Sequence, residues 1–118
     1  MSGLMLYAPE KSTGLALCRL MKRRSLEPEY YDNAEDILEK IRFGAAGTII
    51  LDCSSFPSMN AITKEIEEIL SSAEGIPLII ITPYSEKEME NFRKRGYYIV
   101  EKPICLDHLV TLIKQINK

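Results

Sequence analysis

Short apolar runs of strand length alternate along this chain with segments whose apolar residues recur every three or four positions. Turn-forming residues separate the two kinds of segment. The run at 78–81 has no polar alternation, which is typical of a strand that helices cover on both faces. Five strands are expected on this pattern, at residues 4–7, 29–31, 48–51, 78–81 and 97–100.

A helix is expected after each of these strands. Ser12 or Thr13 is the expected N-cap of the first helix, and Asn33 is that of the second. The third segment has the clearest apolar stripe, formed by isoleucines that lie opposite charged residues. The last three helices are expected over residues 58–73, 86–95 and 106–116.

Repeated β-α units with short connections favour parallel strands joined by right-handed crossovers. The expected fold is therefore α/β: a doubly wound, flavodoxin-like sheet of five parallel strands in the order 2-1-3-4-5. The length of 118 residues is close to the commonest domain size, so we expect residues 1–118 to form a single domain. In such sheets ligands bind beyond the carboxyl ends of the strands.

Charge and hydropathy exclude several classes of partner. Fifteen basic and seventeen acidic residues give a net charge of −2, which argues against nucleic-acid binding by the whole domain. No apolar stretch is long enough to cross a bilayer, and the apolar residues at the start fit a first strand better than a secretory leader. Three cysteines without a C-x-x-C motif indicate reduced thiols, so a cytoplasmic protein is expected.

Four residues at the predicted strand ends form a recognisable set. Asp52 follows the third strand, Thr82 ends the fourth, and Lys102 and Pro103 follow the fifth. Their order resembles the receiver domain of two-component response regulators, and the resemblance covers the whole chain. It implies that Asp52 is the phospho-acceptor, that Thr82 and Lys102 contact the phosphoryl oxygens, and that the bond before Pro103 is cis. An ionised carboxylate is a suitable nucleophile, and a hydroxyl and a cation stabilise phosphoryl charge.

The sequence departs from that family directly after the first strand. Receivers usually carry two adjacent acidic residues there that hold a divalent cation, whereas this chain has Ala8 and Pro9. Mg²⁺ prefers oxygen ligands, so no metal site is expected, and phosphoryl transfer to Asp52 should be very slow. Glu10 is a weak candidate for a single ligand. Asp52 can alternatively be a strand-end carboxylate that pairs with Lys102.

Other polar residues have plainer interpretations. Cys105 and His108 supply only one short pair of ligands, too few for tetrahedral zinc, and His108 is expected to face solvent. Cys53 is expected to be a small packing residue. Tyr97 and Tyr98 should alternate across an edge strand, so that one of them, together with Arg95, is a candidate for a protein contact.

The leading hypothesis is a receiver-like signalling module that is not an enzyme, works independently of phosphorylation and acts through protein-protein interaction. Its expected partner is a protein, such as a histidine kinase or an output protein, or a second copy in a homodimer, and no cofactor is expected. One alternative is an active receiver that is phosphorylated on Asp52 in a phosphorelay with Mg²⁺. Another is a flavodoxin-like domain that binds a small molecule or nucleotide, although residues 8–14 contain only one glycine.

Overall fold

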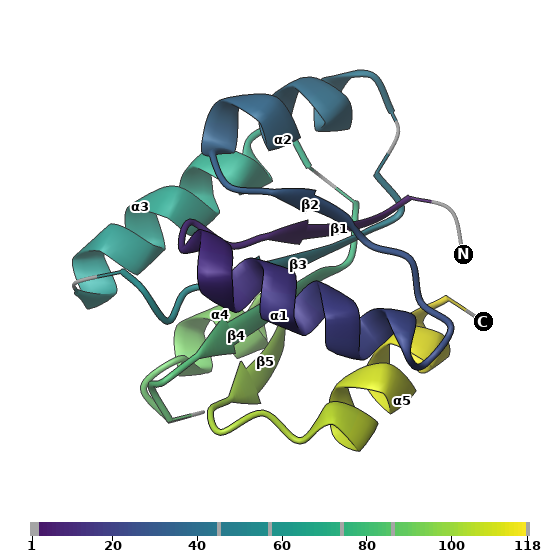
Figure 1. Ribbon diagram of the computed structural model, residues 1–118. Helices are drawn as coiled ribbons and strands as arrows, with labels where there is room; N and C mark the ends of the chain where they lie inside the picture. The colour runs from purple at the N-terminus through teal and green to yellow at the C-terminus, as the bar shows by residue number, and fades with distance from the viewer. Residues whose placement is uncertain (1–2, 45, 57, 74, 86, 118) are drawn as a thin grey trace.

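A parallel sheet forms the centre of the computed structural model, which describes residues 3–44, 46–56, 58–73, 75–85 and 87–117 (Figure 1). The strands are β1 (Leu4–Tyr7), β2 (Glu29–Tyr31), β3 (Thr48–Asp52), β4 (Leu78–Thr82) and β5 (Tyr98–Glu101). All neighbours pair in parallel, in the order β2-β1-β3-β4-β5. The expected fold and strand order are confirmed.

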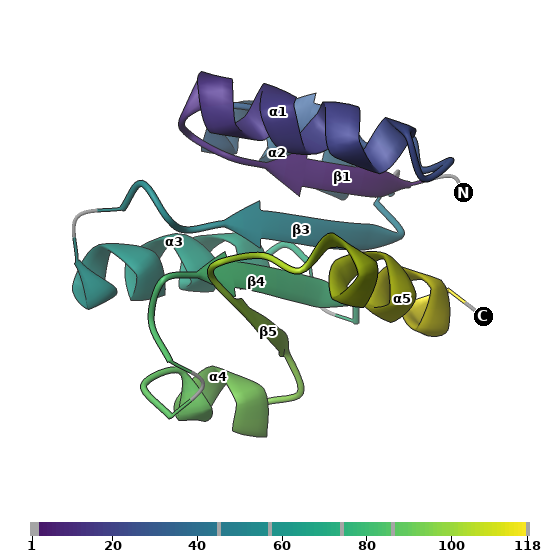
Figure 2. The same cartoon turned by 60° about the horizontal axis from the view of Figure 1, so that its bottom comes forward.

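Five helices cover both faces of the sheet: α1 (Lys11–Lys22), α2 (Ala34–Arg42), α3 (Met59–Leu70), α4 (Glu90–Lys94) and α5 (Leu106–Ile116). Helices α1 and α5 lie on one face, and α2, α3 and α4 lie on the other; Figure 2 shows α5 in front of the sheet and α3 behind it. Among the described residues, no helix is both long and apolar enough to span a membrane.

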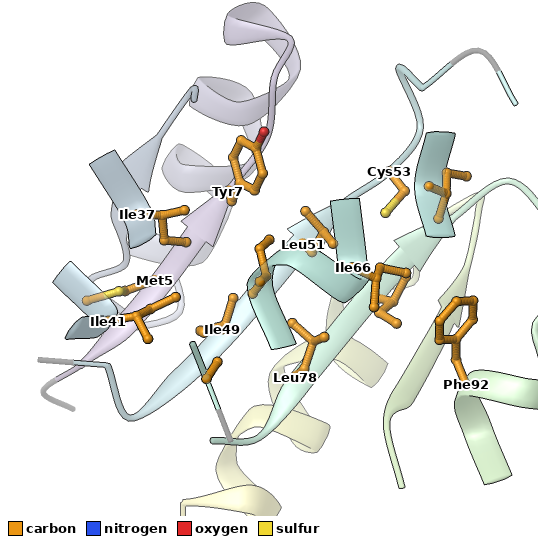
Figure 3. Packing of buried hydrophobic residues seen from close by; sticks show 14 of the residues in the cluster. Met5, Tyr7, Ile37, Ile41, Ile49, Leu51, Cys53, Ile66, Leu78 and Phe92 are labelled. Atoms are coloured by element: carbon orange, nitrogen blue, oxygen red, sulfur yellow. The ribbon is translucent and has the colours of Figure 1, made fainter. Parts of the chain in front are cut away.

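The two helical layers bury opposite faces of the same strands. Ile49 and Leu51 of β3 pack towards α2 and α3, whereas Ile50 between them packs towards α1 and α5. Figure 3 shows the first of these two cores, in which Ile66 of α3 is fully buried. Strands β3 and β4 are buried along their whole length, as expected for central strands that helices cover on both faces.

Local sequence explains several helix boundaries. The Asn33 side chain accepts a hydrogen bond from the Asp36 N–H at 2.9 Å, so the predicted cap of α2 is confirmed. The prediction of Ser12 or Thr13 as the cap of α1 is wrong. This helix begins at Lys11, after Glu10, because the Glu10 carbonyl already accepts the Gly14 N–H at 3.0 Å.

The fourth helix differs most from its predicted range of 86–95. It covers only Glu90–Lys94, and Glu86 lies outside the described residues. A turn precedes the helix, in which the Ser85 hydroxyl and the Glu88 carboxylate hydrogen-bond at 3.1 Å. This turn buries Met89 completely. A polar stretch that reads as one helix is therefore divided into a turn and a short helix.

The remaining boundaries move by up to three residues. Helix α3 is shorter than its predicted range at both ends, and Ser58 is its N-cap, since the Ser58 hydroxyl accepts the Ala61 N–H at 3.2 Å. The fifth strand begins at Tyr98 instead of 97, because Gly96 has φ +95° and the Tyr97 N–H donates to the Phe92 carbonyl.

Candidate functional site

Three predicted site residues lie at the carboxyl edge of adjacent strands. Asp52 ends β3, Thr82 ends β4, and Lys102 directly follows β5. The Lys102 N–H donates to the Thr82 carbonyl at 2.9 Å, which continues the ladder between β4 and β5 by one residue. The Lys102–Pro103 peptide bond is cis. Parallel register thus places a carboxylate, a hydroxyl and an ammonium group along one edge.

The side chains of Asp52 and Lys102 approach each other from β3 and β5. Lys102 Nζ lies 3.6 Å from Asp52 Oδ2, within ion-pair range but beyond a normal hydrogen bond. Thr82 is fully buried, and its Oγ1 accepts a hydrogen bond from the Tyr84 N–H at 3.2 Å. The ion pair between Asp52 and Lys102 is thus present in the structure.

Ser54 is a member of the site that the sequence analysis missed. Its hydroxyl donates to Asp52 Oδ1 at 2.6 Å and accepts a hydrogen bond from Lys102 Nζ at 2.9 Å. Its backbone N–H also donates to Asp52 Oδ1, at 3.0 Å. An aspartate side chain often accepts the backbone N–H two residues further on in a turn, and this position of Ser54 was the one available indication. Ser54 bridges the two charged groups.

Asp52 is almost completely enclosed. Only 2% of its surface is exposed, and among the described residues Oδ2 is buried without a hydrogen-bond partner. A buried carboxylate is costly unless it is paired with a cation. The ammonium group of Lys102, whose side chain is 26% exposed, is therefore the group that compensates this charge.

The residues that follow β1 contribute backbone groups and apolar side chains to this edge of the sheet. Ala8 is buried, its N–H donates to the Tyr31 carbonyl at 3.0 Å, and its own carbonyl accepts the Tyr30 hydroxyl at 2.7 Å. Neither Ala8 nor Pro9 carries a side-chain oxygen. The exposed Glu10 carboxylate accepts hydrogen bonds from the Ser12 and Thr13 hydroxyls at 3.1 and 3.0 Å, so it is engaged at the start of α1.

These residues do not fit a magnesium ion. Within the described ranges, no three acidic, histidine or cysteine side chains gather closely enough to hold a metal. Asp52 offers one unengaged oxygen, and that atom faces Lys102. Mg²⁺ requires near-octahedral oxygen coordination, usually with one or two carboxylates and several waters. A cation at this position would have to compete with the lysine ammonium.

Tyr30 is a second residue that the sequence analysis missed at this edge. Its ring crosses from β2 to α1 and lies against Gly14, where an added Cβ would sit only 2.3 Å from Tyr30 Cε1. Burial raises the pKa of the Tyr30 hydroxyl, and the Asp32, Cys18 and Asp52 side chains add to this shift. A glycine inside a helix was the available indication, because it suggests close approach of another group.

The cysteine and histidine interpretations agree with the structure. Cys53 is fully buried, and burial together with the Asp52 and Glu65 charges raises the pKa of its thiol. Such a thiol is unreactive, so Cys53 is a packing residue. His108 and Cys105 are exposed on α5 and just before it.

The predicted contact residues lie near β5, which is an edge strand as expected. Tyr98 is 39% exposed, whereas Tyr97 packs partly against the core. The Arg95 guanidinium lies 5.5 Å from the centroid of the Tyr97 ring and forms an ion pair with Glu67. Tyr98 and Arg95 are thus the exposed members of the three, and Arg95 is already engaged by Glu67 and the Tyr97 ring.

Comparison with known proteins shows that the fold of this chain is similar to those of several solved structures. No protein-family model matches the chain, and no curated protein sequence matches it. A response regulator receiver protein from Pseudoalteromonas atlantica is 18% identical with a TM-score of 0.75, over 97% of this chain and 95% of that one. The chemotaxis protein CheY4 of Vibrio cholerae is 16% identical with a TM-score of 0.74, over 98% of each chain.

A third solved structure carries a different description. A putative pilus assembly protein from Burkholderia thailandensis is 13% identical with a TM-score of 0.75, over 99% of this chain and 98% of that one. At identities this low, the comparisons establish the fold. The chain has the fold of the response-regulator receiver, as the strand-end residues led us to expect.

Proposed function

We propose that this chain, which has the fold of a response-regulator receiver, is a signalling module of the two-component type that works without an acyl phosphate on Asp52. It acts by binding a protein partner, for which a histidine kinase or an output protein is the expected class. It is cytoplasmic, needs no cofactor and is not itself an enzyme.

The arrangement around Asp52 carries this proposal. One oxygen of the carboxylate accepts two hydrogen bonds from Ser54, and the other is enclosed beside Lys102. Strand β1 is followed by Ala8 and Pro9, whose side chains lack the oxygen ligands that a divalent cation needs. An anionic phosphodonor approaching Asp52 would therefore meet a buried anion neutralised by Lys102 alone.

A protein partner is supported by the surface of β5. Tyr98 stands exposed on an edge strand, and aromatic side chains are enriched at protein contacts. Arg95 lines the same surface hollow as Tyr98, and its guanidinium is held by an ion pair with Glu67 and by the Tyr97 ring. A homodimer through this surface is the alternative to a different protein partner.

Beryllofluoride with Mg²⁺, a mimic of the phosphoryl group on aspartate, tests the proposal. We expect the amide resonances of Ser54, Thr82 and Lys102 to stay unchanged at millimolar concentrations of both, because the metal ligands are missing. The measurement is a ¹H–¹⁵N correlation spectrum recorded through the titration. A receiver that keeps both acidic residues is the positive control.

The active-receiver alternative predicts the opposite result. Saturable shifts at Thr82 and Lys102 that disappear in an Asp52→Asn variant would establish aspartyl phosphorylation as feasible and contradict the proposal. Shifts that persist in that variant would identify non-specific binding. The third hypothesis, a small-molecule or nucleotide domain, receives less support. A phosphate-binding loop is usually rich in glycine, whereas residues 8–14 contain one glycine, Gly14, and it is packed against the Tyr30 ring.

A further inference from the structure

We propose that the Ser54 hydroxyl is a phosphoryl acceptor for small activated donors such as acyl phosphates. Ser54 Oγ donates to Asp52 Oδ1 at 2.6 Å and accepts a hydrogen bond from Lys102 Nζ at 2.9 Å. A hydroxyl with a carboxylate base on one side and a cation on the other has the contacts of an activated nucleophile.

Accessibility favours Ser54 over Asp52 as the attacking group. Asp52 is 2% exposed, its Oδ1 already accepts two hydrogen bonds, and its Oδ2 is enclosed. Ser54 is partly exposed at the start of the loop that follows β3. A donor that enters from solvent therefore meets the serine hydroxyl before it meets the carboxylate.

Charge favours the same residue. With no metal ligands after β1, an anionic carboxylate that attacks an anionic donor has only Lys102 to offset the repulsion. The serine hydroxyl is neutral until its proton leaves, and the transferring group can be stabilised by the Lys102 ammonium. Phosphoryl transfer demands little of the nucleophile, so an aspartate can serve as the base that accepts the hydroxyl proton.

The step balances with the groups present and the named donor. A bond forms between Ser54 Oγ and phosphorus, and the bond from phosphorus to the carboxylate oxygen of the acyl phosphate breaks. The Ser54 proton passes to Asp52, and the leaving carboxylate departs with its electron pair. The product is a phosphoserine ester. A small donor is required because the hydroxyl is only partly exposed.

This inference goes beyond the proposed function, which concerns the absence of an acyl phosphate on Asp52 and the binding of a partner. The two claims fail under different results. A serine ester survives hydroxylamine, whereas an aspartyl phosphate is cleaved by it, so the same adduct can be assigned to one residue or the other.

Acetyl phosphate, incubated with the whole chain in the presence of a chelator, provides the test. We expect the intact mass to increase by one phosphoryl group, the adduct to survive hydroxylamine, and peptide mapping to place it on Ser54. A chain without an adduct would overturn the inference and leave the proposed function standing. A hydroxylamine-sensitive adduct on Asp52 would overturn both.

Three variants separate the roles of the residues. Ser54→Ala should abolish the adduct, while Ser55→Ala, which changes the exposed neighbouring serine, should leave it unchanged. Asp52→Asn should slow its formation about 100-fold, because the base is lost while the side-chain shape is kept. An unchanged rate in Asp52→Asn, or an adduct that persists in Ser54→Ala, would contradict the assignment. Thermal unfolding of each variant verifies that it is folded.

Discussion

Replacing Lys102 with methionine is expected to lower the free energy of unfolding by about 3 kcal/mol, because it leaves a buried carboxylate without its cation. The Lys102 ammonium group lies 3.6 Å from Asp52 Oδ2. Its removal also breaks the hydrogen bond that Lys102 Nζ donates to the Ser54 hydroxyl. Methionine keeps most of the hydrocarbon stem, so the loss reports on the charge. Urea denaturation at neutral pH measures it.

Asp52→Asn provides the second arm of this experiment. Neutralising the carboxylate removes the charge that Lys102 compensates, so Asp52→Asn alone should change the free energy of unfolding by less than about 1 kcal/mol. Adding it to Lys102→Met should recover most of the lost stability. Lys114→Met, at an exposed position on α5, is the matched control and should stay within about 0.5 kcal/mol. Equal changes in the free energy of unfolding for Lys102→Met and Lys114→Met would show that the ion pair does not stabilise the fold.

Gly14→Ala is expected to destabilise the chain by about 2 kcal/mol, although alanine is the better helix former. The new Cβ would lie 2.3 Å from Tyr30 Cε1 and 2.7 Å from Cζ, so the ring must swing away. That movement breaks the hydrogen bond from the Tyr30 hydroxyl to the Ala8 carbonyl. Thermal or urea unfolding of the single variant gives the net effect.

A double-mutant cycle with Tyr30→Ala isolates the cause. Without the ring, Gly14→Ala should raise the free energy of unfolding by about 1 kcal/mol, because only its helix propensity remains. The effect of the same substitution therefore changes sign with residue 30. If Gly14→Ala has the same sign in both backgrounds, the close packing of Tyr30 on α1 is not what requires glycine.

Much of the architecture is predictable from short-range patterns. Apolar runs and helical periodicity give the five β-α units, and the absence of polar alternation at 78–81 predicts a central strand. The Asn33 cap is local too, since its partner is three residues away. The strand-end residues follow once the strands are placed, because parallel strands end at the same edge.

The parts that the sequence did not predict depend on contacts between distant residues. Ser54 bridges to Lys102 across 48 positions, and Tyr30 reaches Ala8 across 22. Neither contact leaves a periodic pattern. The start of α1 was misplaced because two hydroxyl residues compete as caps, and in the structure both donate to the Glu10 carboxylate instead. The fourth helix was overestimated because burial of Met89 in the preceding turn overrides local helix propensity.

The site has most of the residue set that the resemblance to receivers implies. The carboxylate, hydroxyl and ammonium groups remain at the ends of β3, β4 and β5, and only the end of β1 lacks its expected acids. In their place Ala8 is packed beneath the Tyr30 hydroxyl, so this part of the edge is closed by an aromatic side chain. This arrangement supports the proposal that the chain acts through a protein partner and without a metal-dependent step at Asp52.

Binding of Mn²⁺ tests this account most directly, because Mn²⁺ prefers the same oxygen ligands as Mg²⁺ and broadens the resonances of nearby amides. The measurement is the intensity of each amide signal as Mn²⁺ is added to the ¹⁵N-labelled chain. The account predicts that the amide signals of Cys53, Ser54 and Lys102 lose no more intensity than those of equally exposed amides far from the site. Selective, saturable loss of these three signals at low Mn²⁺ concentration, reversed by excess Mg²⁺, would contradict it.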